Sequence, residues 1–233
     1  MADHVRRLST EKNVAQVHSF HSFIRSTDAD DKSKVATLYD DWTSYDEDVQ
    51  KVAYKGPSES GVMVSQYCKD KSISILDCGS GTGLVGEVLY PHGFKNVTAL
   101  DISQKSLDIA KAKGVYSRLI CTQAGKHQMP FEENEFDALV CVGCFIPGHM
   151  NQEVFPDWLR VVKPGGYIFL IMRTSYLQEG EFKGQFDQAI QTHVDAKRWV
   201  KVEARVIPEY FDMFEGVGFV FKVLIVDKRL EDL

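Results

Sequence analysis

A chain of 233 residues is long enough to fold as one α/β domain with a sizeable core. Its formal net charge of −6 argues against a broad basic surface for nucleic acid. No run approaches the roughly 18 consecutive apolar residues of a membrane span, and the N-terminus lacks a hydrophobic signal region. We therefore expect a single cytoplasmic domain without nucleic-acid or membrane contacts. The oligomeric state stays open.

The first 50 residues predict a helical cap. Apolar residues recur at helical spacing over 11–27 and again over 35–42, and an acidic, polar break at 28–33 separates the two stretches. No linker or repeat divides the rest of the chain. We expect one domain over 1–233, with the cap at 1–50 and the core at 70–233.

Residues 73–83 carry the most informative pattern in the chain. An apolar run typical of a strand ends in Asp77 and passes directly into Gly79, Gly81 and Gly83, and a helix-like stretch follows. A strand, a glycine turn and a helix start place backbone N–H groups toward a ligand. Glycine permits positive φ and lets the ligand approach the backbone. The pattern predicts a binding site at this turn.

A second apolar run, 97–100, ends in Asp101, eighteen residues beyond Gly83. An acid at the tip of the second strand can accept hydrogen bonds from both hydroxyls of a ribose. Ser103 can cap the helix that follows. The spacing differs from the dinucleotide pattern G-x-G-x-x-G. We therefore expect a nucleoside ligand.

The remaining core elements alternate between strand and helix. Strands are expected at 118–122, 137–142 and 166–172, and a helix at 151–162 is interrupted or restarted near Pro156. This alternation predicts a parallel sheet with helices on both faces.

The C-terminal part predicts a helix over 184–197 and two strands at 200–206 and 219–226. No convincing helix lies between these two strands. We expect them to form an antiparallel pair at one edge of the sheet.

The motif Asp77-x-Gly79-x-Gly81-x-Gly83 resembles motif I of the class I S-adenosylmethionine-dependent methyltransferases. Later segments resemble the same family in the same order, over roughly residues 35–175. They are the cap at 39–46, Asp101, the fourth strand at 136–143, and the Lys-Pro-Gly-Gly turn with the fifth strand at 161–171. The resemblance implies a Rossmann-like, doubly wound, seven-stranded, mostly parallel sheet with an antiparallel edge pair. It also implies S-adenosylmethionine as the cofactor.

The resemblance assigns residues to parts of the donor. Asp77 would orient the amino-acid portion, and Gly79 and Gly81 would approach the methionine end and the sugar. Asp101 would hold the ribose, and Ile102 would pack on the adenine. Further expected donor-binding positions are Gly83 and Val142.

Thr122 and Gln123 could face the adenine edge, although many family members have an acid in this region. Tyr39, Trp42 and Tyr45 would form a lid over the donor. Aromatic residues at helical spacing are also typical of plain packing, so both interpretations stay open.

A sulfonium makes its methyl group electrophilic, so transfer is an in-line displacement that the protein promotes by alignment and exclusion of water. His149, in the loop after the fourth strand, is a candidate general base or a solvated loop residue. Arg173 could bind an anionic substrate or cap the sheet edge. The acidic run 46–48 is interpreted as a solvated face. No acidic trio indicates a metal site, so we expect metal-independent transfer.

Five cysteines occur, at 68, 78, 121, 141 and 144. An odd count and positions beside predicted strands favour buried reduced thiols over disulfides. The pair Cys141-x-x-Cys144 fits packing better than redox or zinc chemistry, because Cys141 falls inside a predicted strand and no second pair exists. Cys144 could still line the active site.

The favoured hypothesis is an enzyme that methylates a small-molecule acceptor. A protein that binds S-adenosylmethionine without turnover, as a regulatory or interaction partner, is the alternative. Methylation of protein or RNA also stays open, because a local groove can be basic. The amino-methylating signature Asn/Asp-Pro-Pro-Tyr/Phe is absent at 142–145, which argues against N-methylation of nucleic-acid bases.

Overall fold

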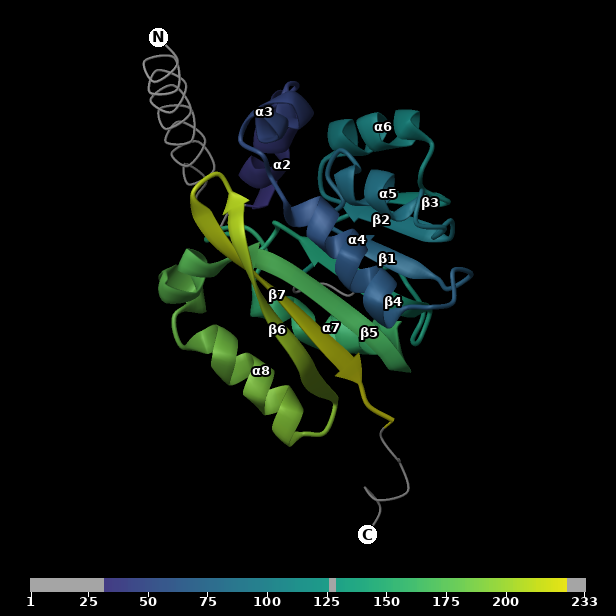
Figure 1. Cartoon of the computed structure of the whole chain (residues 1–233), viewed down its shortest axis with the longest axis vertical. Coiled ribbons are helices and arrows are strands. Elements are labelled where there is room, and N and C mark those ends of the chain that lie inside the picture. Colours follow the sequence, from purple (N-terminus) through teal and green to yellow (C-terminus); the bar gives the residue numbers. More distant parts are fainter. Residues whose placement is uncertain (1–31, 126–128, 226–233) are drawn as a thin grey trace.

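The computed structural model describes residues 32–125 and 129–225 (Figure 1). The helix expected over 11–27 and the last residue of the strand expected over 219–226 lie outside these ranges. Of the expected cap, the described part contains α2 (Lys32–Asp41) and α3 (Tyr45–Lys51).

Within the described residues, seven strands form one sheet in the order β3-β2-β1-β4-β5-β7-β6. Strands β1 to β5 run parallel, and β7 pairs antiparallel with both β5 and β6. The predicted fold class and antiparallel edge pair are therefore confirmed. The strands are β1 (Ile75–Cys78), β2 (Val97–Asp101), β3 (Arg118–Cys121), β4 (Phe136–Val142), β5 (Val162–Arg173), β6 (Trp199–Phe211) and β7 (Phe214–Val223).

Alternation along the central strands produces a core on each face of the sheet. In β4, Leu139 and Cys141 pack in the core that contains α7 and α8, whereas Ala138, Val140 and Val142 pack on the side of α4 and α5. Figure 1 shows α4 crossing one face of the sheet. The remaining helices of the core are α4 (Gly56–Tyr67), α5 (Leu84–Leu89), α6 (Gln104–Lys113), α7 (Phe155–Val161) and α8 (Gln185–Asp195).

Helix starts follow the local signals. Ser103 is the N-cap of α6, and its side chain accepts a hydrogen bond from the Ser106 N–H at 3.0 Å. The expected restart near Pro156 is also present. A 3₁₀ turn over Gln152–Val154 leads into α7, where Pro156 occupies the first turn and therefore removes no intrahelical bond.

Three strands are longer than predicted. β5 starts at Val162 rather than 166, because Val162 already pairs with Phe136 before the register shifts. Gly165, with φ +87°, takes up the bulge. β6 and β7 extend toward each other and meet at a turn where Asp212 has φ +56°. Pro208 is tolerated within β6 because this is the edge strand.

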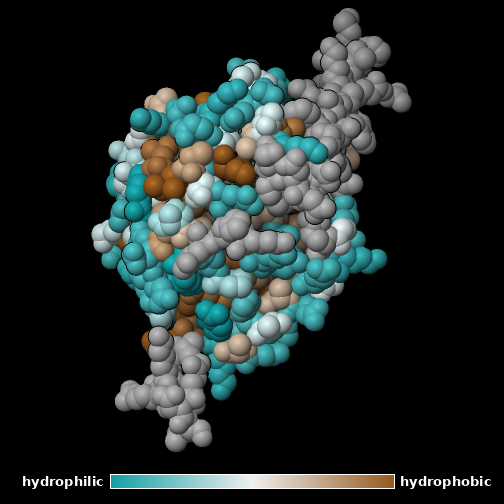
Figure 2. Space-filling model, turned by 180° about the vertical axis from the view of Figure 1, so that it is seen from behind, coloured by the Kyte–Doolittle hydropathy of each residue, from teal (hydrophilic) through white to brown (hydrophobic). Residues whose placement is uncertain are grey.

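The face turned away in Figure 1 is mostly hydrophilic, with hydrophobic residues in separate patches (Figure 2). Within the described ranges, no helix is both long and apolar enough to cross a bilayer.

Candidate active site

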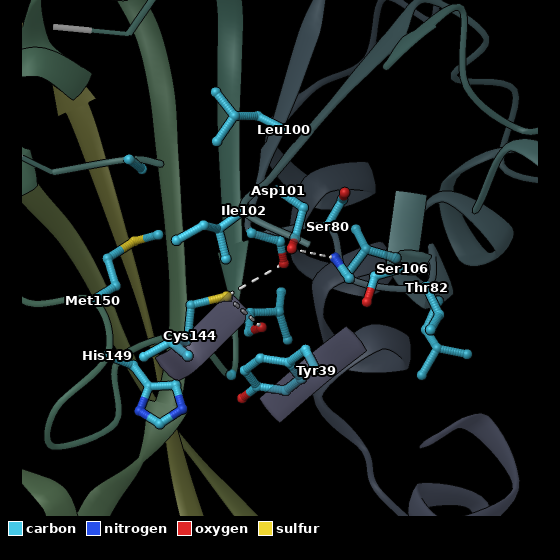
Figure 3. Close-up of a pocket in the computed structure, with 18 of the residues that line it drawn as sticks. Tyr39, Ser80, Thr82, Leu100, Asp101, Ile102, Ser106, Cys144, His149 and Met150 are labelled. Carbon is cyan, nitrogen blue, oxygen red and sulfur yellow. Dashed lines mark hydrogen bonds between the residues drawn. The ribbon is translucent and has the colours of Figure 1, made fainter. Parts of the chain in front are cut away.

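The carboxyl ends of β1, β2 and β4 meet under the cap and enclose a hollow of about 130 Å³ (Figure 3). Open α/β sheets bind ligands at this edge. Ten of the residues predicted to bind donor or act in catalysis line it: Tyr39, Tyr45, Gly79, Gly81, Asp101, Ile102, Thr122, Gln123, Val142 and His149. Trp42, Asp77 and Gly83 do not line it.

The glycine turn after β1 needs its glycines for different reasons. Gly79, Gly81 and Gly83 have φ values of +80°, +52° and +94°. A Cβ at Gly79 would overlap the sulfur of Cys144, whereas a Cβ at Gly81 would meet no atom within 4 Å. A Cβ at Gly83 would press on the Tyr116 ring at 3.0 Å, so this glycine serves packing behind the turn.

Asp101 ends β2 inside the hollow. Its Oδ2 accepts a hydrogen bond from the Gly81 N–H at 2.8 Å, and its Oδ1 accepts one from the Ser103 N–H at 2.8 Å. Each carboxylate oxygen can accept a second bond, so two acceptor positions remain for ribose hydroxyls. Burial raises the pKa of this carboxyl, and the backbone donors oppose that rise. These features fit the sugar of the expected cofactor.

Asp77 lies behind the glycine turn and is fully buried. Its Oδ2 accepts a 2.6 Å hydrogen bond from the Tyr116 hydroxyl, and burial raises its pKa to about 7. The same hydroxyl accepts the Gly86 N–H at 3.1 Å. The structure thus gives Asp77 a place in the support of the turn rather than in the lining of the hollow.

The cap contributes two of its three predicted lid residues. Tyr39 and Tyr45 line the hollow. Trp42 instead stacks on Tyr39 with ring centroids 6.4 Å apart, and its indole N–H donates to Asp48 at 3.0 Å. Packing is therefore the better interpretation for Trp42, because its ring supports the tyrosines from behind.

The acidic run 46–48 is not a simple solvated face. Asp46 accepts hydrogen bonds from Thr82 in the glycine turn and from Lys113 in α6. Asp48 accepts bonds from Trp42, Ser44 and Lys51 within the cap. The interpretation of the whole run as a solvated face was wrong, because Asp46 is bonded to the core and Asp48 is bonded within the cap, and only Glu47 is exposed.

On the opposite wall, Cys144 and His149 follow β4. The Cys144 thiol lies 3.3 Å from the Gly79 carbonyl oxygen and 3.4 Å from that of Val142. The His149 ring is 7% exposed and meets Tyr39 edge to face at 5.8 Å (Figure 3).

All five cysteines are reduced thiols, with three buried, Cys144 half-buried and Cys121 exposed. Burial of Cys121 was therefore a wrong expectation.

A second hollow of about 60 Å³ adjoins the first, and both are lined by Tyr39, Tyr45, Tyr54 and Gly143. Its other walls are mostly apolar and aromatic, with the buried Arg173 among them. The Arg173 guanidinium lies 3.2 Å from the centre of the Phe214 ring. Arg173 therefore faces a cavity rather than capping the outer edge of the sheet.

Sequence reasoning missed Tyr54 and Tyr210, which line this second hollow beside the predicted Tyr39 and Tyr45. The Tyr54 and Tyr210 hydroxyls lie 3.2 Å apart although 156 positions separate them in the chain. A Cβ at Gly143 would overlap the Tyr54 hydroxyl. No linear motif joins these residues, because their contact depends on the long hairpin of β6 and β7 returning to the segment between α3 and α4.

The sheet order, the glycine turn and the acid at the end of β2 form a Rossmann-like methyltransferase fold, and they fit S-adenosylmethionine, the expected cofactor. Residues 76–170 match the methyltransferase domain family. Over 141 residues the chain is 36% identical to methyltransferase-like protein 27 of Homo sapiens, covering 59% of this chain and 57% of that protein. Over 102 residues it is 36% identical to the ubiquinone biosynthesis O-methyltransferase of Dechloromonas aromatica, and this match covers 41% of this chain and 42% of that protein. The chain thus spans about half the length of these relatives.

Solved structures share the fold. One comes from the complex of the Haloferax volcanii Trm112 methyltransferase activator with a methyltransferase. Its TM-score is 0.64 at 14% sequence identity, and the match covers 82% of this chain and 98% of that chain. Geranyl diphosphate C-methyltransferase from Streptomyces coelicolor has a TM-score of 0.56 at 12% identity, and the match covers 78% of this chain and 85% of that chain. Both likenesses show the architecture alone.

Proposed function

We propose that this chain transfers the methyl group of S-adenosylmethionine to a small-molecule acceptor bound in the second hollow. The observation that carries the proposal is the shared wall of the two hollows, formed by Tyr39, Tyr45, Tyr54 and Gly143. A donor in the larger hollow and an acceptor in the smaller one meet at this wall. Close, aligned reactants are the main requirement of a displacement reaction.

The cofactor supplies an electrophilic methyl group, and the residues of this chain bind, orient and exclude water. Asp101 and the turn around Gly79 and Gly81 hold the nucleoside part. Tyr39 and Tyr45 cover it from the cap, which keeps water from the reaction. The predicted metal-independence stays a prediction. Among the described residues, no group of three or more histidine, cysteine or acidic side chains could hold a metal ion.

The tyrosines at the shared wall stay protonated. Burial raises the pKa of Tyr39 and of Tyr54 well above the ordinary value, so their hydroxyls act as hydrogen-bond partners of the acceptor rather than as bases. His149 lines the larger hollow beside Tyr39 and is the candidate that would take a proton from a weakly nucleophilic acceptor.

The size of the second hollow favours a small acceptor over RNA or protein. At about 60 Å³ and with mostly apolar and aromatic walls, it suits a compact, largely apolar molecule. Arg173 is the charged group on this wall, so an acidic group on the acceptor would find a complementary charge there.

The test is release of S-adenosylhomocysteine from S-adenosylmethionine in the presence of small phenols, carboxylic acids, thiols and amines, with RNA and protein substrates in parallel. We expect turnover with a small acidic or neutral aromatic molecule. Tyr210→Phe should change acceptor KM or kcat while the affinity for S-adenosylhomocysteine stays within about twofold, because Tyr210 lines the second hollow but not the first. Donor binding without turnover on any acceptor would favour a binding protein instead.

A further inference from the structure

We propose that the repeated Tyr-Asp pair of the cap is a two-point latch that controls release of the donor and its product. In each pair the tyrosine, Tyr39 or Tyr45, covers the donor hollow. The acid that follows it, Asp40 or Asp46, is bonded to the core. The inference rests on the proposed function, because the latch would retain S-adenosylmethionine and S-adenosylhomocysteine.

The first point of the latch is Asp46, in the first turn of α3. Its Oδ2 lies 2.6 Å from the Lys113 Nζ, at the end of α6. Its Oδ1 accepts a short hydrogen bond from the Thr82 hydroxyl. Thr82 stands between Gly81 and Gly83, so this carboxylate joins the cap to the donor-binding turn itself.

The second point is Asp40, near the end of α2. Its Oδ1 accepts the Ser103 hydroxyl at 2.6 Å and the Lys105 N–H at 3.3 Å. Both donors lie at the N-terminus of α6, where the helix dipole favours an anion. The Ser103 N–H donates to Asp101, the proposed ribose-binding acid. Ser103 therefore links Asp40 to Asp101.

The exposure of the ion pair suits a contact that opens and closes. The side chain of Lys113 is 15% exposed and that of Asp46 is 36% exposed. Charge-assisted hydrogen bonds at such sites are stronger than those of fully exposed pairs, yet water can replace them when the cap lifts. Opening of a lid often limits product release in enzymes.

The chain offers matched controls for the acid and for the lysine. Glu47 is the exposed neighbour of Asp46, and Lys111 is an exposed lysine on the same helix as Lys113. Glu87, on α5, bonds to Lys113 at 2.7 Å and is not one of the two latch acids. Glu47→Gln, Lys111→Met and Glu87→Gln therefore change charge without breaking the latch.

The experiment measures the dissociation rate of S-adenosylhomocysteine by stopped-flow displacement, with thermal unfolding of each unliganded variant alongside. We expect Asp46→Asn and Lys113→Met to release the ligand about tenfold faster, and the three controls to stay within about twofold of the natural protein. The double variant should match the single variants rather than multiply their effects, because both remove one contact. Raising the salt concentration should speed release from the natural protein and from Glu47→Gln, but not from Lys113→Met.

Equal release rates for Asp46→Asn, Lys113→Met and Glu47→Gln would overturn the latch. If Asp46→Asn does not fold, Thr82→Val is measured instead. This variant removes the Thr82 hydroxyl, the neutral partner of Asp46, and keeps the ion pair between Asp46 and Lys113. An unchanged release rate in Thr82→Val would again overturn the latch. Failure of the natural protein to bind S-adenosylhomocysteine would be a different result, because it would remove the proposed function rather than the latch alone.

Discussion

The Tyr116 hydroxyl donates a 2.6 Å hydrogen bond to the carboxylate of Asp77, behind the glycine turn that faces the larger hollow. The same hydroxyl accepts the Gly86 N–H near the start of α5. One side chain thus joins the end of β1 to the helix that follows the turn. Gly86 makes this contact possible, because a Cβ there would lie 2.5 Å from the tyrosine ring.

Burial of Asp77 predicts a specific pH dependence of stability. Its pKa is raised from 3.8 to about 7 in the folded protein, so between these values the folded state holds a proton that the unfolded state has lost. The contribution of Asp77 therefore lowers the free energy of unfolding as the pH rises from about 4 to about 7, by up to about 1.4 kcal/mol per pH unit.

Urea unfolding of the natural protein and of Asp77→Asn at pH 5 and pH 7 measures this contribution. The variant should lose less stability between the two pH values, since its amide does not titrate and can still accept the Tyr116 hydrogen bond. Equal losses in both proteins would show that Asp77 is ionised in the folded state at pH 5.

Alanine at Gly79 and at Gly81 should separate stability from binding. Gly79→Ala places a methyl group on the Cys144 sulfur and should lower the free energy of unfolding by about 2 kcal/mol or more. Gly81→Ala meets no neighbour and should lower it by only about 1 kcal/mol, from its positive φ. Donor binding should nevertheless weaken at least tenfold in Gly81→Ala, because its methyl group occupies space beside the ligand.

Chemical denaturation and calorimetric titration of the two variants give both quantities. Full donor affinity in a well-folded Gly81→Ala would contradict the placement of the donor against this turn.

Alkylation by iodoacetamide should report donor binding at Cys144. The Cys144 thiol lines the larger hollow, whereas Cys121 is exposed and outside its lining. Saturating S-adenosylhomocysteine should slow modification of Cys144 at least about fivefold and leave Cys121 unaffected. Mass spectrometry of proteolytic peptides resolves the two sites in one sample. Equal rates at Cys144 with and without ligand would place the donor elsewhere.

Much of the fold was predictable from local signals. Asp77 and Asp101 each end an apolar run, Ser103 has the side chain of an N-cap, and the absence of a helix before β7 indicates an antiparallel edge. The lengths of β5 and β6 were not predictable, because Gly165 and Pro208 are typical of turns and only pairing with neighbouring strands keeps them in the sheet.

The site was predictable where it follows strand ends and not where it depends on distant contacts. Gly79, Asp101 and Thr122 stand directly at or after parallel strands, so their convergence follows from topology. Tyr116 and Lys113 are not marked by any motif, and their partners Asp77 and Asp46 lie 39 and 67 positions away. Such contacts emerge only from the packing of the cap and of α6 on the glycine turn.

The central claim is that the hollow beside Asp101 binds S-adenosylmethionine. The most direct measurement is calorimetric titration of the purified protein with S-adenosylmethionine and S-adenosylhomocysteine, with NAD as the control ligand. Asp101→Ala removes the ribose acceptor, and Asp108→Ala is the matched control, because Asp108 is exposed and accepts its 2.9 Å hydrogen bond from Gln104 within α6.

We predict micromolar binding of both ligands, unchanged in Asp108→Ala and at least tenfold weaker in Asp101→Ala, a loss of about 1.4 kcal/mol or more. No binding by the natural protein, or a preference for NAD, would contradict the account.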